Sequence, residues 1–192
     1  MTYAQVNVDF TANVTSGCGS LQVSFTDQST SSSAAIKSWT WDLGGVASTT
    51  TNPGRIFGTP GKFTICLTVT DEDDNSATSC KDDYIKVYEL PVPDFSVDET
   101  DGCIPFDVEF TNLASSVDGN ITQLIWGVGG SEGVIVDENS LATIQNTYNL
   151  ADSYTISLTV TDDNNCVSTI TCLLYTSPSP RDATLSRMPS SA

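Results

Sequence analysis

The 192-residue sequence contains no histidine, and only seven Lys and Arg residues accompany its 24 Asp and Glu residues. Without histidine, a Ser–His or Cys–His nucleophile pair, histidine-based acid–base catalysis and the usual zinc sites are excluded. The formal net charge of −17 would repel a phosphate backbone, which excludes nucleic acid as a main partner. No apolar run approaches the ~18 residues of a membrane-spanning helix, so we expect no membrane insertion.

Most of the chain consists of two copies of one sequence pattern. Pairs at an offset of 85 residues are Gly17-Cys18 with Gly102-Cys103, and Trp41 with Trp126. A longer motif, residues 63–71, returns at residues 154–162, at an offset of 91 residues. Two copies of this length indicate two small domains in tandem. We place them at residues 4–89 and 90–171, with the prolines of residues 90–93 stiffening a short linker.

Both long motifs have the period of a β-strand. Apolar side chains alternate with Thr, Ser or Cys, and no segment shows a sustained 3.6-residue apolar stripe. Short strands of this kind around one central tryptophan are typical of an antiparallel β-sandwich. We therefore predict an all-β chain, with two tandem immunoglobulin-like sandwiches. The expected core residues are Trp41, Trp126, Phe63, Leu67, Tyr154 and Leu158.

These landmarks resemble the polycystic kidney disease (PKD) domain, an immunoglobulin-like sandwich of secreted and surface proteins. The first copy has Trp41-Asp42-Leu43-Gly44-Gly45 followed by the late-strand motif of residues 60–71. The second has Trp126-Gly127-Val128-Gly129-Gly130 followed by residues 153–162. Both tryptophan turns lack the second Asp of the family pattern, which leaves this turn a structural role. The Gly102-Cys103-Ile104-Pro105 opening is similar to surface proteins of Bacteroidetes-type bacteria.

The C-terminal segment, residues 172–192, shows no strand pattern and is rich in Ser and Pro. Residues 172–182 resemble the translation of a transposase-type sequencing adapter. On this interpretation the natural sequence would stop near Thr171, and the last segment would be disordered.

The cysteines suggest disulfide bonds. Cys66 and Cys80 lie symmetrically about Asp73, so a hairpin turning there places them opposite each other, within disulfide range. Cys103 opens the second copy and Cys166 follows its last long strand, at ends that a sandwich can bring together, and we predict this pair as well. Cys18 is then left unpaired. The alternatives are that it pairs across molecules, that it takes Cys80 and leaves Cys66 alone, or that all thiols are reduced in a cytosolic protein.

Two acidic turns are candidate calcium sites, because hard cations prefer several carboxylate oxygens. The candidate ligands are Asp71, Asp73 and Asp74 in the first copy and Asp162 and Asp163 in the second. No EF-hand spacing is present, and Asp and Asn are common in exposed turns, so a solvated turn is the preferred interpretation.

The tryptophans offer another candidate site, a sugar-stacking platform. Alternation places Trp39, Trp41 and Leu43 on one face, and in sandwiches that face is normally core. No spacing singles out two carboxylates for glycoside hydrolysis, so we predict no catalytic residue and no cofactor apart from the calcium alternative.

The sequence thus favours non-catalytic spacer modules of a secreted or cell-surface protein. Their partners would be neighbouring domains, with adhesion to extracellular polysaccharide or protein as an added role. The alternatives are an accessory, substrate-binding part of a secreted protease or glycoside hydrolase, and a calcium-stabilised adhesin repeat.

Overall fold

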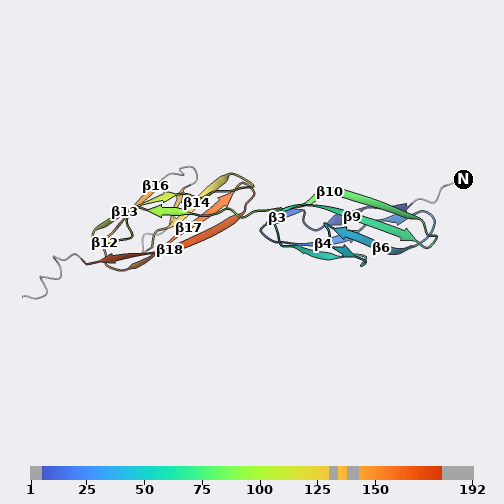
Figure 1. Cartoon of the computed structure of the whole chain (residues 1–192), viewed down its shortest axis with the longest axis horizontal. Coiled ribbons are helices and arrows are strands. Elements are labelled where there is room, and N and C mark those ends of the chain that lie inside the picture. Colours follow the sequence, from blue (N-terminus) through green and yellow to red (C-terminus); the bar gives the residue numbers. More distant parts are fainter. Residues whose placement is uncertain (1–5, 130–133, 138–142, 179–192) are drawn as a thin grey trace, which may run out of the picture. The chain divides into compact units, whose positions relative to one another are not determined.

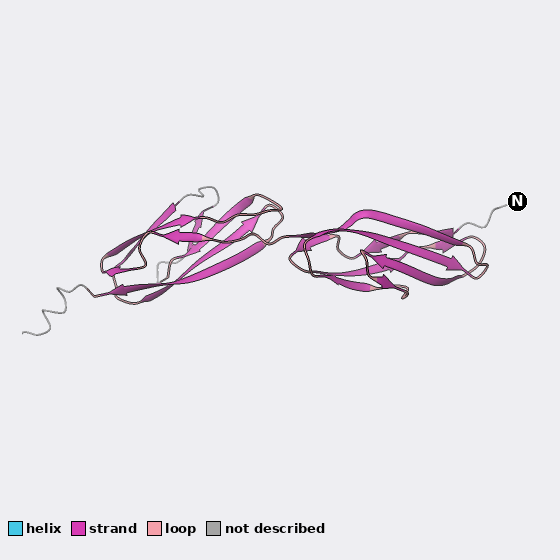
Figure 2. Ribbon diagram, viewed as in Figure 1, coloured by secondary structure: helices cyan, strands magenta, loops and turns pink. Residues whose placement is uncertain are grey.

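In the computed structural model, which describes residues 6–129, 134–137 and 143–178, every regular element is a β-strand (Figures 1 and 2). The predicted all-β class is therefore confirmed. Contacts divide the chain into two compact units, Met1–Glu89 and Leu90–Ala192. The described residues contain no helix long and apolar enough to cross a membrane.

Unit 1 is built from two facing sheets and a short strand pair. The larger sheet has the order β3-β10-β9-β6-β7, the smaller has the order β2-β4-β8, and β1 pairs with β5. The strands are β1 (Val6–Asn7), β2 (Phe10–Ala12), β3 (Ser16–Cys18), β4 (Leu21–Asp27), β5 (Thr30–Ser31), β6 (Ile36–Leu43), β7 (Ala47–Ser48), β8 (Gly54–Phe57), β9 (Gly61–Asp71) and β10 (Ser76–Tyr88).

Unit 2 repeats this plan. Its five-stranded sheet has the order β12-β18-β17-β14-β15, and its three-stranded sheet has the order β11-β13-β16. The strands are β11 (Phe95–Val97), β12 (Asp101–Cys103), β13 (Phe106–Asn112), β14 (Ile121–Gly127), β15 (Val134–Asp137), β16 (Thr143–Tyr148), β17 (Ser153–Asp162) and β18 (Val167–Ser177).

Each unit buries its own core around one tryptophan. In unit 1 the Trp41 ring lies 5.2 Å from Phe10 and 5.8 Å from Phe25, centroid to centroid. In unit 2 the Trp126 ring lies 5.3 Å from Phe95 and 6.0 Å from Phe110. Offset and edge-on ring contacts of this kind stabilise a core beyond the area they bury.

The six residues expected in the cores divide into two groups. Trp41, Trp126, Leu67 and Leu158 are at most 1% exposed, whereas Phe63 and Tyr154 are only partly buried against the cores. Both rings lie beneath the turn after the tryptophan strand, at Gly44 and Gly129. These glycines have φ angles of 71° and 74°, and a Cβ there would come within 3.0 Å and 2.9 Å of the aromatic side chain. Glycine therefore lets the turn close over the ring at the margin of the sandwich.

The expectation that residues 172–177 are disordered is wrong, because they form the second half of β18. The strand pairs antiparallel with β17, from Ser153 opposite Tyr175 to Thr161 opposite Val167, and its last residues pair in parallel with β12. Leu174 is 2% exposed and belongs to the core of unit 2, where it fills the place that Ile85 takes in unit 1. One well-placed leucine and the open edge of β17 are enough to hold the segment. The adapter resemblance itself stays a prediction.

Replacing Leu174 by alanine tests this strand. We expect Leu174→Ala to lower the free energy of unfolding of unit 2 by about 2–5 kcal/mol, since a buried leucine is truncated. The matched control is Leu173→Ala, because Leu173 is 53% exposed and its truncation should change stability by less than about 0.5 kcal/mol. The measurement is chemical denaturation followed by tryptophan fluorescence. Equal, small effects of both variants would mean that this segment does not join the sheet.

Candidate functional site

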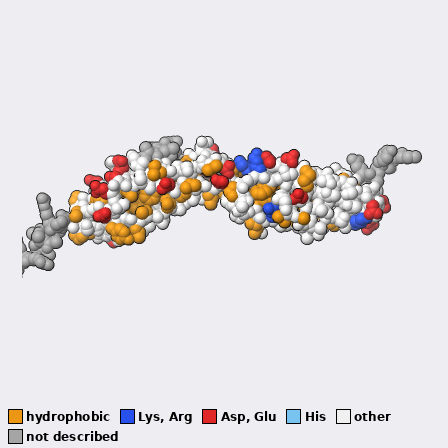
Figure 3. Space-filling model, in the orientation of Figure 1, with side chains coloured by type: hydrophobic (Ala, Val, Ile, Leu, Met, Phe, Trp, Pro, Cys, Tyr) orange, Lys and Arg blue, Asp and Glu red, His pale blue; other side chains and the backbone are white. Residues whose placement is uncertain are grey.

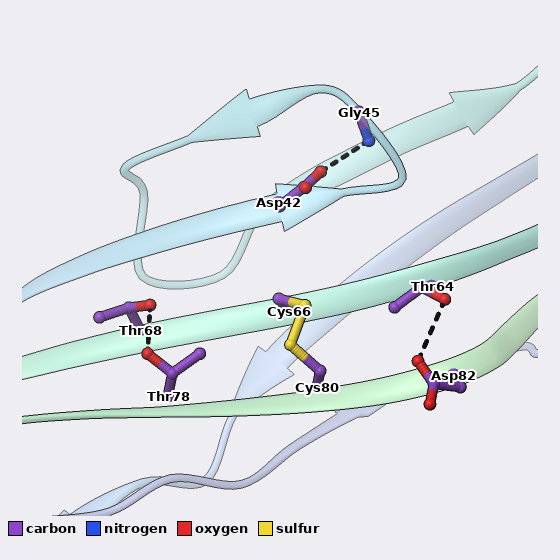
Figure 4. The surroundings of a disulfide bond; sticks show 8 residues. All are labelled: Asp42, Gly45, Thr64, Cys66, Thr68, Thr78, Cys80 and Asp82. Atoms are coloured by element: carbon purple, nitrogen blue, oxygen red, sulfur yellow. Dashed lines mark hydrogen bonds between the residues drawn. A yellow bond between two sulfur atoms is a disulfide. The ribbon is translucent and has the colours of Figure 1, made fainter.

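The outer face of the larger sheet in unit 1 carries a disulfide between Cys66 of β9 and Cys80 of β10 (Figure 4). The two residues are direct partners in the β9–β10 ladder, with their Cα atoms 4.1 Å apart. This is the predicted bond, and it follows from the hairpin register alone. The bond closes a loop with a sequence separation of 14, which constrains the unfolded chain by about 3 kcal/mol.

Polar cross-strand pairs flank the disulfide along the same two strands (Figure 4). Thr68 and Thr78 share a hydrogen bond of 2.8 Å on one side, and Thr64 donates to Asp82 on the other. A hollow of about 310 Å³ beside the bond is lined by Thr40, Trp41, Asp42, Gly45, Ala47, Cys66 and Thr68. The one carboxylate in this lining, Asp42, accepts a hydrogen bond of 2.6 Å from the Gly45 amide. The chemistry of this face is that of a clamped sheet surface.

The predicted Cys103–Cys166 disulfide is wrong, because Cys103 is free and exposed. Cys103 pairs with Ser177 at the end of β18, whereas Cys166 precedes Val167 at its beginning. Ten residues of extended chain separate these ends, roughly 33 Å at about 3.3 Å per residue. The expectation that Cys18 is left over is also wrong, since Cys18 is disulfide-bonded.

The acidic turn of unit 1 is organised around the carboxylate of Asp71, which is fully buried. Ser31 and Ser33 donate their hydroxyls to it at 2.9 and 2.8 Å. The amides of Asp73 and Asn75 donate at 3.0 and 2.9 Å, and the Asn75 side chain donates as well. The sequence analysis missed both serines, because nothing in a Ser-rich loop 40 residues upstream singles them out.

Unit 2 has a simpler version of the same turn. The carboxylate of Asp162, 1% exposed, accepts hydrogen bonds from Ser116 and from the amides of Asn164 and Cys166. The ladder register aligns Cys166 with Asn75, so the earlier alignment of Cys166 with Ser76 is off by one residue. The side-chain amide that Asn75 adds in unit 1 therefore has no counterpart here.

The structure does not bring the predicted calcium ligands together. Asp71 and Asp162 are occupied by protein donors, Asp74 pairs with Lys37, and Asp163 accepts from Asn120. Within the described ranges no three His, Cys, Asp or Glu side chains are gathered so that they could hold a metal ion. The geometry matches the preferred interpretation, a turn held by its own hydrogen bonds.

Trp39 lies at the margin of the core rather than on an open platform. It is partly buried, and its indole Nε1 donates to the Asp27 carboxylate at 2.7 Å. With Trp41 and Trp126 buried, these three indoles leave no ring face free for sugar stacking.

A second hollow, of about 510 Å³, lies on the three-stranded sheet of unit 2. It is lined by Asp98, Asp107, Val108, Glu109, Gln145, Asn146 and Thr147. Its carboxylates accept hydrogen bonds from the Glu109 amide, Thr147 and Gln145. Residues 90–180 contain no Lys or Arg, and the blue side chains in Figure 3 lie on unit 1. This part of unit 2 therefore has a surface charge of one sign.

Residues 5–87 match the model of the PKD domain family. Unit 1 is a PKD domain. The PKD1 domain of Vibrio anguillarum Epp is 27% identical, covering 48% of this chain and 99% of its own, with a TM-score of 0.40. The PKD1 domain of the Vibrio cholerae metalloprotease PrtV is 26% identical, covering 45% and 96%, with a TM-score of 0.38. A 1.5-MDa bacterial ice-binding adhesin is 11% identical, covering 93% and 66%, with a TM-score of 0.48. Curated proteins gave no match.

In this PKD domain the pKa of Asp71 makes stability depend on pH. Burial alone would raise that pKa, but the hydrogen bonds from Ser33, Asn75 and Ser31 outweigh burial and hold it well below its usual range. A carboxyl whose pKa is lower in the folded state than in the unfolded state stabilises the fold above the unfolded pKa of about 3.9. This contribution is lost as the pH falls below that value.

We expect Asp71→Asn to lower the melting temperature of the PKD domain by several degrees at pH 7. The gap to the wild-type chain should narrow as the pH falls from about 5 to 3, because Asp71 then becomes protonated in the unfolded chain. The measurement is thermal unfolding at a series of pH values. Glu72→Gln, at an exposed neighbour, is the matched control and should follow the wild type. A gap that does not change with pH would contradict the assigned role of the carboxylate.

Proposed function

We propose that the chain forms non-catalytic, extracellular spacer modules of a larger secreted or cell-surface protein. The observation that carries this proposal is the Cys66–Cys80 disulfide, which joins two strands on a solvent-facing sheet. Disulfides persist in oxidising compartments and are rare in the cytosol, so this bond favours an exported protein. The PKD match at residues 5–87 supports an accessory role, since the domain family consists of modules attached to other proteins.

The hydrogen bonding of the polar groups supports a spacer over a binding module. The carboxylates of Asp42, Asp71 and Asp162 all accept hydrogen bonds from their own units. An interaction site usually presents polar groups that converge on a hollow and still lack a partner. In the described part of the chain the strongly held carboxylates instead brace turns between strands.

Unit 2 is proposed to be a second module of the same kind. Thr159 and Thr169 share a hydrogen bond of 2.8 Å, as Thr68 and Thr78 do in unit 1. The Asp162 turn and the Trp126 core repeat the features of unit 1 at matching positions. Two modules joined by the proline-containing residues 90–93 would hold neighbouring domains apart.

The proposal is tested by measuring binding of the intact chain to insoluble cellulose, chitin, xylan and collagen. A spacer should remain in the supernatant in every case, because its polar groups are used internally. Retention that disappears in a variant of the unit 2 hollow, Asp107→Ala with Glu109→Ala, would overturn the spacer role in favour of adhesion. Retention on one polysaccharide without loss in that variant would favour the accessory role for a secreted hydrolase.

The calcium-stabilised adhesin is tested by thermal unfolding in 2 mM calcium and in EDTA, about the concentration range of extracellular sites. We expect melting temperatures that agree within about 1 °C, because protein donors occupy Asp71 and Asp162. Magnesium is the matched control for general screening of the −17 charge. A rise specific to calcium would contradict the spacer proposal.

A further inference from the structure

Two cysteine positions recur at fixed places in this fold. The first opens each unit, in Gly17-Cys18 and Gly102-Cys103. Both cysteines lie on a short strand that pairs in parallel with the end of the last long strand, Cys18 opposite Tyr88 and Cys103 opposite Ser177. We name this the opening position.

The second place is the hairpin position, which precedes the last long strand. Cys166 occupies it in unit 2, with its amide donating to Asp162 at 3.0 Å, and Asn75 occupies it in unit 1. The last strand separates the opening position from the hairpin position by roughly 33 Å within a unit. A module of this fold therefore cannot join its own two positions.

The two opening cysteines differ in their state. Cys18 is disulfide-bonded, whereas Cys103 is exposed and carries a free thiol. The same position in the repeat is thus used for a bond in one copy and is open in the other. Cys172 is also exposed and free, but its place in the β17–β18 ladder, opposite Ile156, is taken by Lys81 in unit 1. Cys172 therefore has no counterpart in the repeat.

We propose that Cys103 forms a disulfide with the hairpin-position cysteine of another module of this fold in the same larger protein. The bond rests on the proposed function, because a link between modules would stiffen a spacer. Its formation removes two protons and two electrons from the two thiols. Oxidised glutathione accepts them and becomes two molecules of reduced glutathione.

The test is a tandem chain in which a second copy, starting at Ala4, follows Ser177 of the first copy. Six residues, 4–9, then lie between Ser177 and Phe10, as six residues, 89–94, lie between Tyr88 and Phe95. The second copy carries Asn75→Cys, which creates a hairpin-position thiol in the module that follows Cys103. The short link gives the two thiols a high effective concentration.

After oxidation in a glutathione buffer, Cys103 of the first copy should lose its reactivity toward alkylating reagent. Peptide mass spectrometry without reduction should then find it bonded to the introduced thiol at position 75. The link should persist in Cys172→Ser. It should be absent when Asn75 is kept, in which case Cys103 should react as a free thiol.

Formation of the Cys66–Cys80 bond in the second copy shows that the Asn75→Cys module has folded. With that bond present, a Cys103 that stays free, or that carries only glutathione, overturns the proposal. Should that module not fold, Ser76→Cys provides a second thiol at the same turn, and the same two outcomes decide. Binding of a polysaccharide or of collagen would overturn the spacer role and leave this disulfide test unaffected, so the two failures are distinguishable.

Discussion

The strict alternation of side chains on β9 and β17 is the constraint on which the rest of the structure depends. Each strand is paired on both sides, β9 with β6 and β10, and β17 with β14 and β18. The inward residues Ile65, Leu67 and Val69 are fully buried, so a shift by one residue would expose them all. The same alternation turns the threonines and Cys66 outward, where β10 presents Cys80 directly opposite. Core and disulfide are thus two consequences of one register.

A second constraint acts at the ends of these strands. Asp71 and Asp162 end β9 and β17 and are buried as carboxylates, which is costly unless hydrogen bonds compensate. Each recruits donors from its own turn and from a distant loop, Ser31 in one unit and Ser116 in the other. The turn is therefore acidic because it fixes a crossover between the sheets. Its carboxylates are used in holding the sandwich closed.

The sequence predicted what depends on local periodicity. Alternation identified the strands and the buried Trp41, and symmetry about Asp73 identified the Cys66–Cys80 pair. It failed where the answer depends on strand order: Cys103 was paired with Cys166 because nothing local shows that β12 lies at the far end of β18. It also failed for residues 172–177, since one buried side chain, Leu174, within a polar segment leaves no periodic signal. The donors to Asp71 were missed for the same reason, because they come from a loop without a pattern.

These features describe modules whose polar groups hold the structure together, which suits a spacer outside the cell. The claim at the centre of this account is that β9 and β10 hold Cys66 and Cys80 as a bonded pair on the outer face. It is tested most directly by alkylating the folded chain, recovered from an oxidising compartment, before and after reduction. We predict that Cys66 and Cys80 react only after reduction, whereas Cys103 and Cys172 react before it. Reaction of Cys66 and Cys80 in the folded, unreduced chain would contradict the account.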